Sequence, residues 1–455
     1  MHRTNIFFLT EWLKSSKRKP LVIRGARQVG KTWLVRHFAK LQGKKLLEIN
    51  LEKQPSLASL FSDNDPRQIL LNLEATFNKS IDPKNYLLFI DEIQAAPELL
   101  AKLRWFAEDM PELPVIAAGS LLEFVLAKHS FSMPVGRISY MYLEPLSFEE
   151  FLLASNKQHL VEYIKAFTWQ TTIPLFIHEQ LMILFKEYII IGGMPEAVSN
   201  WIHDKSLQTV SQVHYDLLAT YRDDFAKYSG RIATERLDEV MMAIPKFLGK
   251  KFVYSKINPS IQVNAIKQSL NLLCKAKVCH QVLGCAANGV PLEAEIQDKY
   301  MKAILLDVGL CSTALGLSLA QVNAANEIDL INKGGIAEQV VGQILRTIVP
   351  PYTEPALYYW HRTAKGSDAE VDYIIQHKNN VIPIEVKAGS TGSLKSLHLF
   401  MGLKHFSLAT RVNSDIPRQI EVNIKDTQGN PVNYVLLSIP FYLLSELHRI
   451  INENK

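Results

Sequence analysis

The sequence has few cysteines and no metal-binding pattern around them. Its four cysteines are Cys274, Cys279, Cys285 and Cys311. None of them forms a Cys-x-x-Cys pair and no histidine lies at zinc-finger spacing from them, which argues against a structural zinc site. We therefore expect reduced thiols, as is usual in cytoplasmic proteins.

Long apolar segments are also missing. The short apolar stretch at residues 6–9 is followed by Glu11 and by a basic cluster at 14–19, which is unlike a secretory signal. The richest apolar stretch, residues 181–198, is interrupted by charged residues, two glycines and a proline, so we do not expect it to span a bilayer. The sequence thus predicts a cytoplasmic protein without a membrane partner.

The chain has little excess charge of either sign. It carries 50 basic and 45 acidic residues, for a net charge of +5, which permits contact with nucleic acid but does not indicate it. A hydrophobic share of 47% is ordinary for a globular protein. The 455 residues exceed the roughly 250–300 that one hydrophobic core serves, so we expect two or three domains.

The first part of the chain alternates short apolar runs with segments of helical periodicity. This alternation predicts a parallel sheet covered by helices on both faces. The predicted strands are residues 21–23, 45–51, 86–90 and 114–118, and the predicted helices are residues 1–20, 31–41, 57–79 and 99–109.

The pattern changes after residue 143. Residues 147–224 read as almost continuous helix with a break at 192–195. Short helices and then two strands follow between residues 236 and 311, which is the order of a winged helix. A helix at 334–348 and strands at 357–361, 371–376 and 381–387 make the last third α/β again.

A phosphate-binding motif lies between the first predicted strand and the next helix. Residues 25–32 fit the pattern G-x-x-x-x-G-K-[ST]. Glycines let the backbone amides turn toward phosphate oxygens, and the helix that follows points its positive dipole end at the same anion. We expect Lys31 to bridge the β- and γ-phosphates of ATP and the Thr32 hydroxyl to coordinate Mg²⁺. The expected nucleotide-binding residues are Gly25, Ala26, Arg27, Gln28, Val29, Gly30, Lys31 and Thr32.

Two acidic residues follow the third predicted strand. The apolar run 87–90 delivers Asp91 to the carboxyl edge of the sheet, where it can hold magnesium through water. Glu92 is placed to polarise the attacking water as a general base. A strand that ends in two acids also occurs without function, but the glycine loop upstream favours the catalytic interpretation.

Polar residues near the next strand complete the expected ATP site. Ser120 follows the strand at 114–118 and is a candidate sensor of the γ-phosphate, with a helix cap as the alternative. Arg137 is a candidate for stabilising the transition state in cis or in a neighbouring copy, with a surface ion pair as the alternative.

Several of these motifs resemble those of a widespread bacterial and archaeal family of AAA-type ATPases. The resemblance is carried by residues 24–32, 89–94, 134–137, 143–151 and 192–196. In that family the ATPase domain is followed by a domain of unknown function that contains a nuclease-like fold. The resemblance therefore implies such a fold at the end of this chain. It leaves open whether Arg137 or Arg222 completes the ATP site.

The C-terminal third contains a set of acidic residues that resembles the PD-(D/E)XK nuclease core. Asp372 begins one predicted strand, and Glu385 and Lys387 lie two positions apart on the next, so that they share a face. Glu338 matches an extra acid that some of these enzymes place before the first strand. Carboxylates of this kind bind Mg²⁺ in nucleases, and the lysine stabilises developing negative charge. An exposed ion pair at a strand end is the alternative for Glu385 and Lys387.

Basic residues in two places are candidates for contacts with nucleic acid. Those near the acidic set are Arg346, His361, Arg362, Lys365 and Lys395, for which a solvated surface is equally consistent. In the expected winged helix, Lys267, Asn271 and Lys275 are spaced to share one helix face that can meet a groove. Packing between domains is the alternative for that helix.

The sequence therefore predicts a multidomain α/β protein. The expected parts are a P-loop AAA-type ATPase domain (1–145), a helical lid (146–230), a winged-helix module (231–325) and a restriction-endonuclease-like α/β domain (326–455). The leading hypothesis is hydrolysis of ATP with Mg²⁺, coupled to the binding or cleavage of DNA or RNA. The alternative is a nucleotide-dependent switch that binds a protein partner, and a homo-oligomer is compatible with both.

Overall fold

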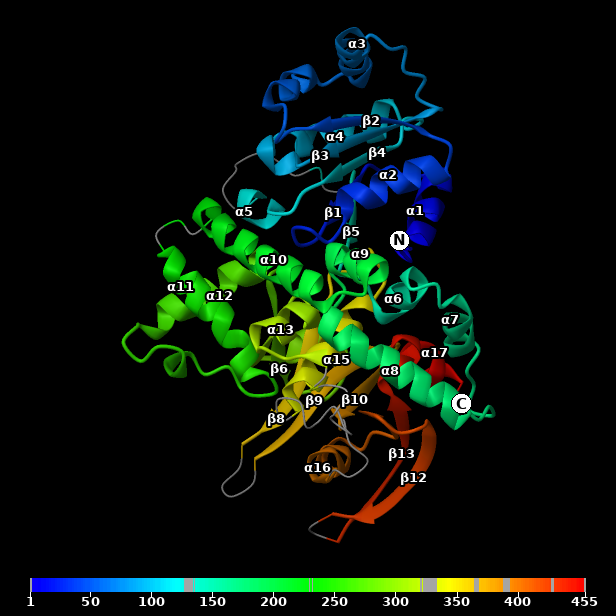
Figure 1. Cartoon of the computed structure of the whole chain (residues 1–455), viewed down its shortest axis with the longest axis vertical. Helices are drawn as coiled ribbons and strands as arrows, with labels where there is room; N and C mark the ends of the chain where they lie inside the picture. Colours follow the sequence, from blue (N-terminus) through cyan, green and yellow to red (C-terminus); the bar gives the residue numbers. More distant parts are fainter. Residues whose placement is uncertain are drawn as a thin grey trace.

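Two sheets at opposite ends of the molecule are separated by a helical layer (Figure 1). The computed structural model describes residues 2–126, 134, 136–228, 230, 232–319, 321, 334–363, 368–387, 393–426 and 429–453. The N-terminal sheet has five strands and the C-terminal sheet has eight.

The N-terminal sheet is parallel throughout, with the order β2-β3-β4-β1-β5. Its strands are β1 (Leu21–Arg24), β2 (Lys45–Asn50), β3 (Tyr86–Asp91), β4 (Val115–Ala118) and β5 (Ser139–Tyr142). Every residue of β3 and β4 is buried, as expected for central strands covered on both faces. The four predicted strands are confirmed, whereas β5 was not predicted.

Helices cover both faces of this sheet. They are α1 (Asn5–Lys14), α2 (Lys31–Leu41), α3 (Pro66–Phe77), α4 (Leu99–Asp109) and α5 (Leu122–Leu126), with 3-10 turns at Pro55–Phe61 and Ile93–Ala95. The predicted single helix over 57–79 is wrong, because the chain breaks before Pro66. Asp65 caps α3 by accepting a hydrogen bond from the Arg67 amide, and Pro66 takes the first helical position.

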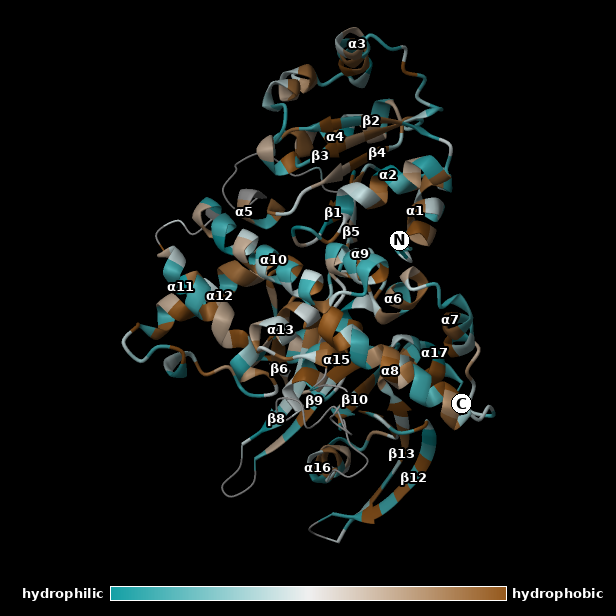
Figure 2. Cartoon of the chain, in the orientation of Figure 1, coloured by the Kyte–Doolittle hydropathy of each residue, from teal (hydrophilic) through white to brown (hydrophobic). Residues whose placement is uncertain are grey.

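Five helices form the layer between the sheets. They are α6 (Phe148–Ala154), α7 (Gln158–Lys165), α8 (Leu175–Ile191), α9 (Pro195–Asp204) and α10 (Leu207–Tyr228). Figure 2 shows hydrophobic colours along much of α8, which packs against α13 (Val308–Ala314) and against the 3-10 turn Phe441–Glu446. This contact joins the helical layer to the C-terminal sheet.

The chain breaks between α8 and α9 at residues 192–195, as expected, and this turn packs closely against the start of α13. The Gly193 amide donates to Asp307 Oδ2 at 2.6 Å, and a Cβ on Gly192 would lie 2.0 Å from Asp307 Oδ1. On the other side, a Cβ on Gly193 would lie 2.1 Å from the Leu146 carbonyl oxygen. Only glycine leaves room at these two positions.

The segment expected as a winged helix has the predicted order of elements. It contains α11 (Thr234–Ala243), α12 (Val263–Lys275), β6 (Cys279–Cys285) and β7 (Ile296–Leu305), with 3-10 turns at Ile244–Phe247, Tyr254–Lys256 and Leu292–Glu295. The β6–β7 hairpin does not stand alone, however. β6 pairs in parallel with β8 (Leu357–Arg362), so the hairpin is the edge of the large sheet.

The C-terminal region is built on the order α15-β8-β9-β10-α16-β11. Its elements are α15 (Gly335–Thr347), β9 (Ala369–His377), β10 (Asn380–Val386), α16 (Lys395–Lys404), β11 (Leu408–Asn413), β12 (Arg418–Lys425), β13 (Pro431–Pro440) and α17 (Leu447–Asn452). The strand order is β12-β13-β11-β10-β9-β8-β6-β7. β8, β9 and β10 are antiparallel neighbours, whereas β11 runs parallel to β10.

Within the described residues, no helix is both long enough and apolar enough to cross a membrane.

Candidate functional site

The glycine loop forms a cradle between β1 and α2. Gly25 has φ +152° and a Cβ there would lie 2.3 Å from the Leu143 carbonyl oxygen. Gly30 has φ +92° and precedes the first residue of α2. Since both positions require glycine, the amides of the loop and of the α2 N-terminus are free to face one anion.

Lys31 is buried inside this cradle, with 7% of its surface exposed. Its Nζ donates to the carbonyl oxygens of Gly25, at 3.1 Å, and Ala26, at 2.7 Å. Burial lowers the pKa of the ammonium group to about 8. A phosphate in the cradle would supply the negative charge that this buried cation lacks.

Oxygen ligands suited to magnesium lie beside the loop. Thr32 Oγ1 donates to Asp91 Oδ2 at 3.0 Å, and Asn50 Nδ2 donates to the same oxygen at 3.3 Å. Asp91 is the last residue of β3, and burial raises the pKa of its carboxyl group. A hydroxyl and a carboxylate are hard oxygen donors of the kind that Mg²⁺ prefers, so these residues fit the ion.

Glu92 is held by a residue that was not predicted to act. Its backbone lies in the left-handed region, at φ +53°, and its Oε2 accepts a hydrogen bond from Gln94 Nε2. Gly119, at the end of β4, makes room for Gln94, since a Cβ there would lie 2.4 Å from Gln94 Oε1. Gln94 thus fixes the position of the Glu92 carboxylate. The signal for Gln94 in the sequence was that it lies in the motif at residues 89–94.

Ser120 lies on the same edge of the sheet. It is buried, with 3% exposed, and follows Gly119 at the carboxyl end of β4. Because β4 lies between β3 and β1, Ser120 is between the strand that carries Asp91 and the strand that leads to the glycine loop.

The two arginines expected to complete the site are not brought to the loop. Arg137 precedes β5, whose first residue pairs with the first residue of β1, so it lies at the amino edge of the sheet. It forms an ion pair with Glu108 at 2.6 Å. Arg222 is on α10 and pairs with Asp238 of α11. A role for either arginine within one copy of the chain is not favoured by this arrangement.

Arg27, within the loop itself, connects the cradle to the helical layer. Its Nη1 donates to both carboxylate oxygens of Asp224, at 2.5 and 2.6 Å. Tyr221 of the same helix donates its hydroxyl to the Arg27 carbonyl oxygen at 3.0 Å. The two contacts tie α10 directly to the phosphate-binding loop.

A pocket of about 410 Å³ opens beside the cradle. It is lined by Arg3, Val29, Gly30, Trp33, Pro195, Glu196, Ser199 and Asn200. The first turn of α9 therefore faces the glycine loop across a hollow large enough for a nucleobase.

In the C-terminal region, the structure brings the predicted acidic set together. Asp372 Oδ2 accepts a hydrogen bond from the Val386 amide at 2.7 Å, next to Glu385. Lys387 Nζ lies 3.0 Å from Glu385 Oε1, which confirms that the two residues share a face. Glu338 joins the set from the first turn of α15.

Lys302 lies at the centre of this set and was not predicted. Its Nζ is 2.9 Å from Glu338 Oε2 and 3.8 Å from Asp372 Oδ1, and it also pairs with Glu370. The side chain is 4% exposed. The sequence carried no signal for Lys302, because this residue comes from β7, at the far end of the sheet order. Glu370 did have a sequence signal, since it lies two positions before Asp372 on β9.

We call the four acidic residues Glu338, Glu370, Asp372 and Glu385 the carboxylate cluster. Burial affects the pKa values of Glu338 and Glu385. Burial and the Asp372 charge raise the pKa of Glu385 to about 8. Burial raises the pKa of Glu338 to about 7 despite the nearby Lys302 ammonium. Over the described part of the chain, no three His, Cys, Asp or Glu side chains are arranged to hold a metal ion. The fold brings the predicted magnesium ligands Glu338 and Asp372 together around Lys302, with Glu385 beside them.

The basic residues near the cluster have different environments. Arg346 is 6% exposed and donates to both carboxylate oxygens of Glu144, at 2.7 and 3.1 Å. This pair joins α15 to the segment that follows β5, so the prediction that Arg346 flanks a nucleic-acid groove is wrong. Arg362 and Lys395 are exposed and His361 is partly buried, whereas Lys365 lies outside the described residues.

The expected recognition face of α12 is exposed. Lys267, Asn271 and Lys275 are all at the surface, and Ile266, Leu270 and Leu273 are buried on the opposite face. Asn271 Oδ1 accepts a hydrogen bond from Gln281 Nε2 of β6 at 3.1 Å. The alternative interpretation was that this row packs between domains. Among the described residues of one chain, no such packing is observed.

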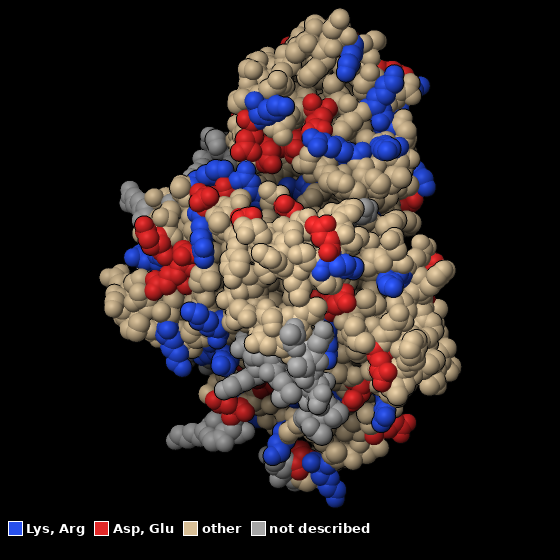
Figure 3. All heavy atoms as spheres, viewed as in Figure 1, with Lys and Arg blue, Asp and Glu red and all other residues tan. Residues whose placement is uncertain are grey.

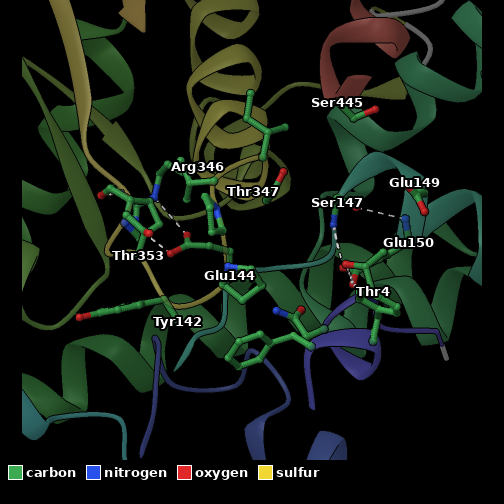
Figure 4. A pocket seen from close by; sticks show the side chains of 18 of the residues that line it. Thr4, Tyr142, Glu144, Ser147, Glu149, Glu150, Arg346, Thr347, Thr353 and Ser445 are labelled. Carbon is green, nitrogen blue, oxygen red and sulfur yellow. Dashed lines mark hydrogen bonds and ion pairs between the residues drawn. The ribbon is translucent and has the colours of Figure 1, made fainter. Parts of the chain in front are cut away.

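A second pocket, of about 490 Å³, lies where the ATPase sheet meets the C-terminal region. Figure 4 shows Thr4 and Glu150 on one side and Arg346 and Thr347 on the other, with the Arg346–Glu144 pair along its wall. Phe7 also lines the pocket and is 75% exposed. This junction pocket therefore combines apolar and acidic groups from distant parts of the sequence.

Three family models match successive parts of the chain. An AAA domain model matches residues 17–152, a domain of unknown function (DUF8612) matches residues 182–321, and another (DUF4143) matches residues 333–440. No curated protein matches the sequence.

Solved structures that are similar to parts of the chain include two proteins of low sequence identity. The Thermotoga maritima RuvB Holliday junction branch migration motor is 15% identical, with 61% of this chain and 89% of that chain covered and a TM-score of 0.29. The C. elegans PCH-2 structure is 10% identical, with 47% and 69% covered and a TM-score of 0.27. Similarity at this level does not define a function. The AAA model match and the arrangement of the glycine loop, Lys31, Thr32 and Asp91 together make the N-terminal part of the chain an AAA-type P-loop ATPase domain.

Proposed function

We propose that the chain hydrolyses ATP with Mg²⁺ and that the ATP cycle controls binding of nucleic acid by its C-terminal half. The observation that carries the ATPase part is the buried Lys31 ammonium within the glycine cradle, next to the Thr32–Asp91 pair. Thr32 and Asp91 would hold Mg²⁺, which neutralises phosphate charge when bound. Glu92, fixed by Gln94, orients and polarises the water that attacks the γ-phosphate in line.

The exposed row on α12 supports the nucleic-acid part. Lys267 and Lys275 offer two cations on one helix face, with the Asn271 amide between them. Figure 3 shows basic and acidic side chains interspersed on the side of α11 and α12. The row would therefore act through local contacts with phosphates rather than through a large positive field.

A continuous series of contacts supports coupling between the two parts. Arg27 of the glycine loop pairs with Asp224 on α10, α10 packs on α11, and α11 packs on α12. A nucleotide that shifts the glycine loop would thus act on the helix pair that carries the exposed row.

The first experiment is the steady-state ATPase rate with Mg²⁺, with and without single- and double-stranded DNA or RNA. We expect stimulation by nucleic acid in the wild type and loss of hydrolysis in Lys31→Ala. An ATPase rate that is indifferent to every nucleic acid would contradict the coupling and leave the ATPase part standing.

A matched pair of variants tests the exposed row. Lys267→Ala/Lys275→Ala should weaken nucleic-acid binding and reduce the log–log salt slope by about 0.9 for each phosphate that is no longer neutralised. The control, Lys79→Ala/Lys84→Ala, removes the same charge from exposed positions on the ATPase domain and should change neither quantity. Equal effects of the two pairs would show that only net charge matters.

A protein-binding switch is the second candidate. The exposed Phe7 beside the junction pocket and Tyr352, which is 63% exposed, favour it. Under this alternative, Phe7→Ala/Tyr352→Ala would abolish partner-stimulated hydrolysis, and nucleic acid would have no effect.

A further inference from the structure

The position at the centre of the carboxylate cluster is filled by an ammonium group of the protein. Lys302 Nζ lies among Glu338, Glu370 and Asp372, with all three within ion-pairing distance. In metal-dependent nucleases the equivalent charge is supplied by a divalent ion. In this chain, the Lys302 Nζ atom lies between the three carboxylates instead.

The Lys302 side chain is fixed in this place on several sides. It leaves β7, is 4% exposed, and its ammonium lies 5.2 Å from the ring centroid of Tyr359. Glu338 is itself confined, because a Cβ on Gly249 would lie 2.6 Å from Glu338 Oε1. The cluster is therefore packed around the ammonium and leaves little freedom for Lys302 to withdraw.

The space between these carboxylates is already occupied by a positive charge. Nζ lies 2.9 Å from Glu338 and 3.8 Å from Asp372 and also pairs with Glu370, whereas a bound Mg²⁺ or Ca²⁺ would need protein oxygens about 2.0–2.6 Å away in the same place. An ion at this centre would overlap the ammonium group and would meet its positive charge at close range. Glu338, Glu370 and Asp372 therefore cannot hold such an ion while Nζ stays between them. Glu385, the fourth member of the cluster, pairs with Lys387 instead.

We infer that Lys302 is the resident cation of the carboxylate cluster and keeps divalent ions out of it. The C-terminal region consequently has a nuclease-like set of residues without a divalent-ion site. Together with the nucleic-acid binding proposed above, on which this step rests, the inference makes the region a binding module that does not cleave phosphodiesters with a metal ion.

The ion itself provides a direct test. Mn²⁺ binding to the full chain is measured by electron paramagnetic resonance without nucleotide, in an Asp91→Asn background that removes the metal ligand of the ATPase site. We expect Asp372→Asn to leave Mn²⁺ binding unchanged. A loss of one bound Mn²⁺ on Asp372→Asn would overturn the inference.

Replacing the ammonium group gives the complementary test. In Lys302→Met, the cluster should acquire one Mn²⁺ site, and adding Asp372→Asn should weaken that site by about tenfold or more. Because an ion that binds only the folded chain stabilises it, the Tm of Lys302→Met should also rise with Mn²⁺ concentration, unlike that of the parent.

Each outcome of this test bears on the inference. A folded Lys302→Met variant that binds no additional Mn²⁺ would show that something other than the ammonium group excludes the ion, and the inference would fail. If Lys302→Met does not fold without Mn²⁺, the comparison of the parent with Asp372→Asn decides.

Discussion

Replacing Asp224 with asparagine removes the charge that joins α10 to the phosphate-binding loop. Arg27 Nη1 donates to both Asp224 oxygens, at 2.5 and 2.6 Å. The Asp224 side chain is 8% exposed and that of Arg27 is 24% exposed. Both groups therefore lose most of their solvation in the native state and depend on each other.

The size of the effect follows from these values. A hydrogen bond between charged groups contributes about 1.5–3 kcal/mol, and breaking a fully buried pair costs about 3–5 kcal/mol. Arg27 keeps some solvent and lies 3.4 Å from Glu52, so the lower range applies. We expect Asp224→Asn to destabilise the contact by about 2 kcal/mol, which corresponds to a roughly 30-fold larger population of the locally opened form of α10.

Amide hydrogen exchange followed by mass spectrometry measures this opening locally. Lys227→Met is the matched control, because Lys227 lies 2.9 Å from the same carboxylate but is 51% exposed. An exposed partner of this kind contributes about 0–1 kcal/mol. If Asp224→Asn and Lys227→Met accelerate exchange over α10 equally, the proposed connection between loop and helix is refuted.

Three further predictions concern protonation and packing. The pKa of buried Lys31 is about 8, and a bound phosphate should raise this pKa. We therefore expect ATP binding near pH 8 to take up protons and ATP affinity to fall as the pH rises above 8. Calorimetry in two buffers of different ionisation enthalpy measures both the proton uptake and the affinity. The pKa of Glu385 in the folded chain, about 8, lies above its ordinary value, so its contribution to stability is present at low pH and is lost as the pH rises through 8. The Glu385→Gln variant should therefore become more stable than the wild type by roughly 1–3 kcal/mol between pH 6 and 9. Gly193→Ala places a Cβ 2.1 Å from the Leu146 carbonyl oxygen and should lower stability by about 1–3 kcal/mol in thermal unfolding.

Each of these has a result that contradicts it. If proton uptake on ATP binding persists in Lys31→Met, a group other than Lys31 takes up the proton. A stability difference between Glu385→Gln and the wild type that does not change with pH would show that Glu385 does not titrate in this range. For Gly193, the control is Gly289→Ala, which has nothing within 4 Å of its added Cβ, and equal losses from both would rule out the steric reason.

Local patterns predicted the N-terminal fold well. The predicted helix at 31–41 has the same bounds as α2, and the strand before Asp91 is β3. These elements carry strong local signals, namely glycines at fixed spacing and an uninterrupted apolar run. β5 was missed because its four residues, Ser139–Tyr142, are mostly half-buried and lack such a run; the strand exists because it pairs with β1.

The positions of charged side chains were harder to predict. Arg137 lies in a motif near the ATPase strands, but the direction of β5 places it at the edge of the sheet away from the loop. Arg346 was expected at a surface, yet Glu144 pairs with it from a part of the chain 202 residues away. Partners that distant leave no local pattern.

The sequence by itself predicted the P-loop domain and the position of its glycine loop, because a strand, a glycine loop and a helix that follow one another form the cradle through local backbone geometry. It also placed Asp372, Glu385 and Lys387 on neighbouring strands, because side chains alternate with a period of two. Only the tertiary structure decided that Lys302 fills the cation position of the carboxylate cluster. β6 pairs with β8, and this pairing carries the β6–β7 hairpin, with Lys302, to the acidic strand β9. The contact depends on the order of strands in a sheet, which no periodicity in the sequence specifies.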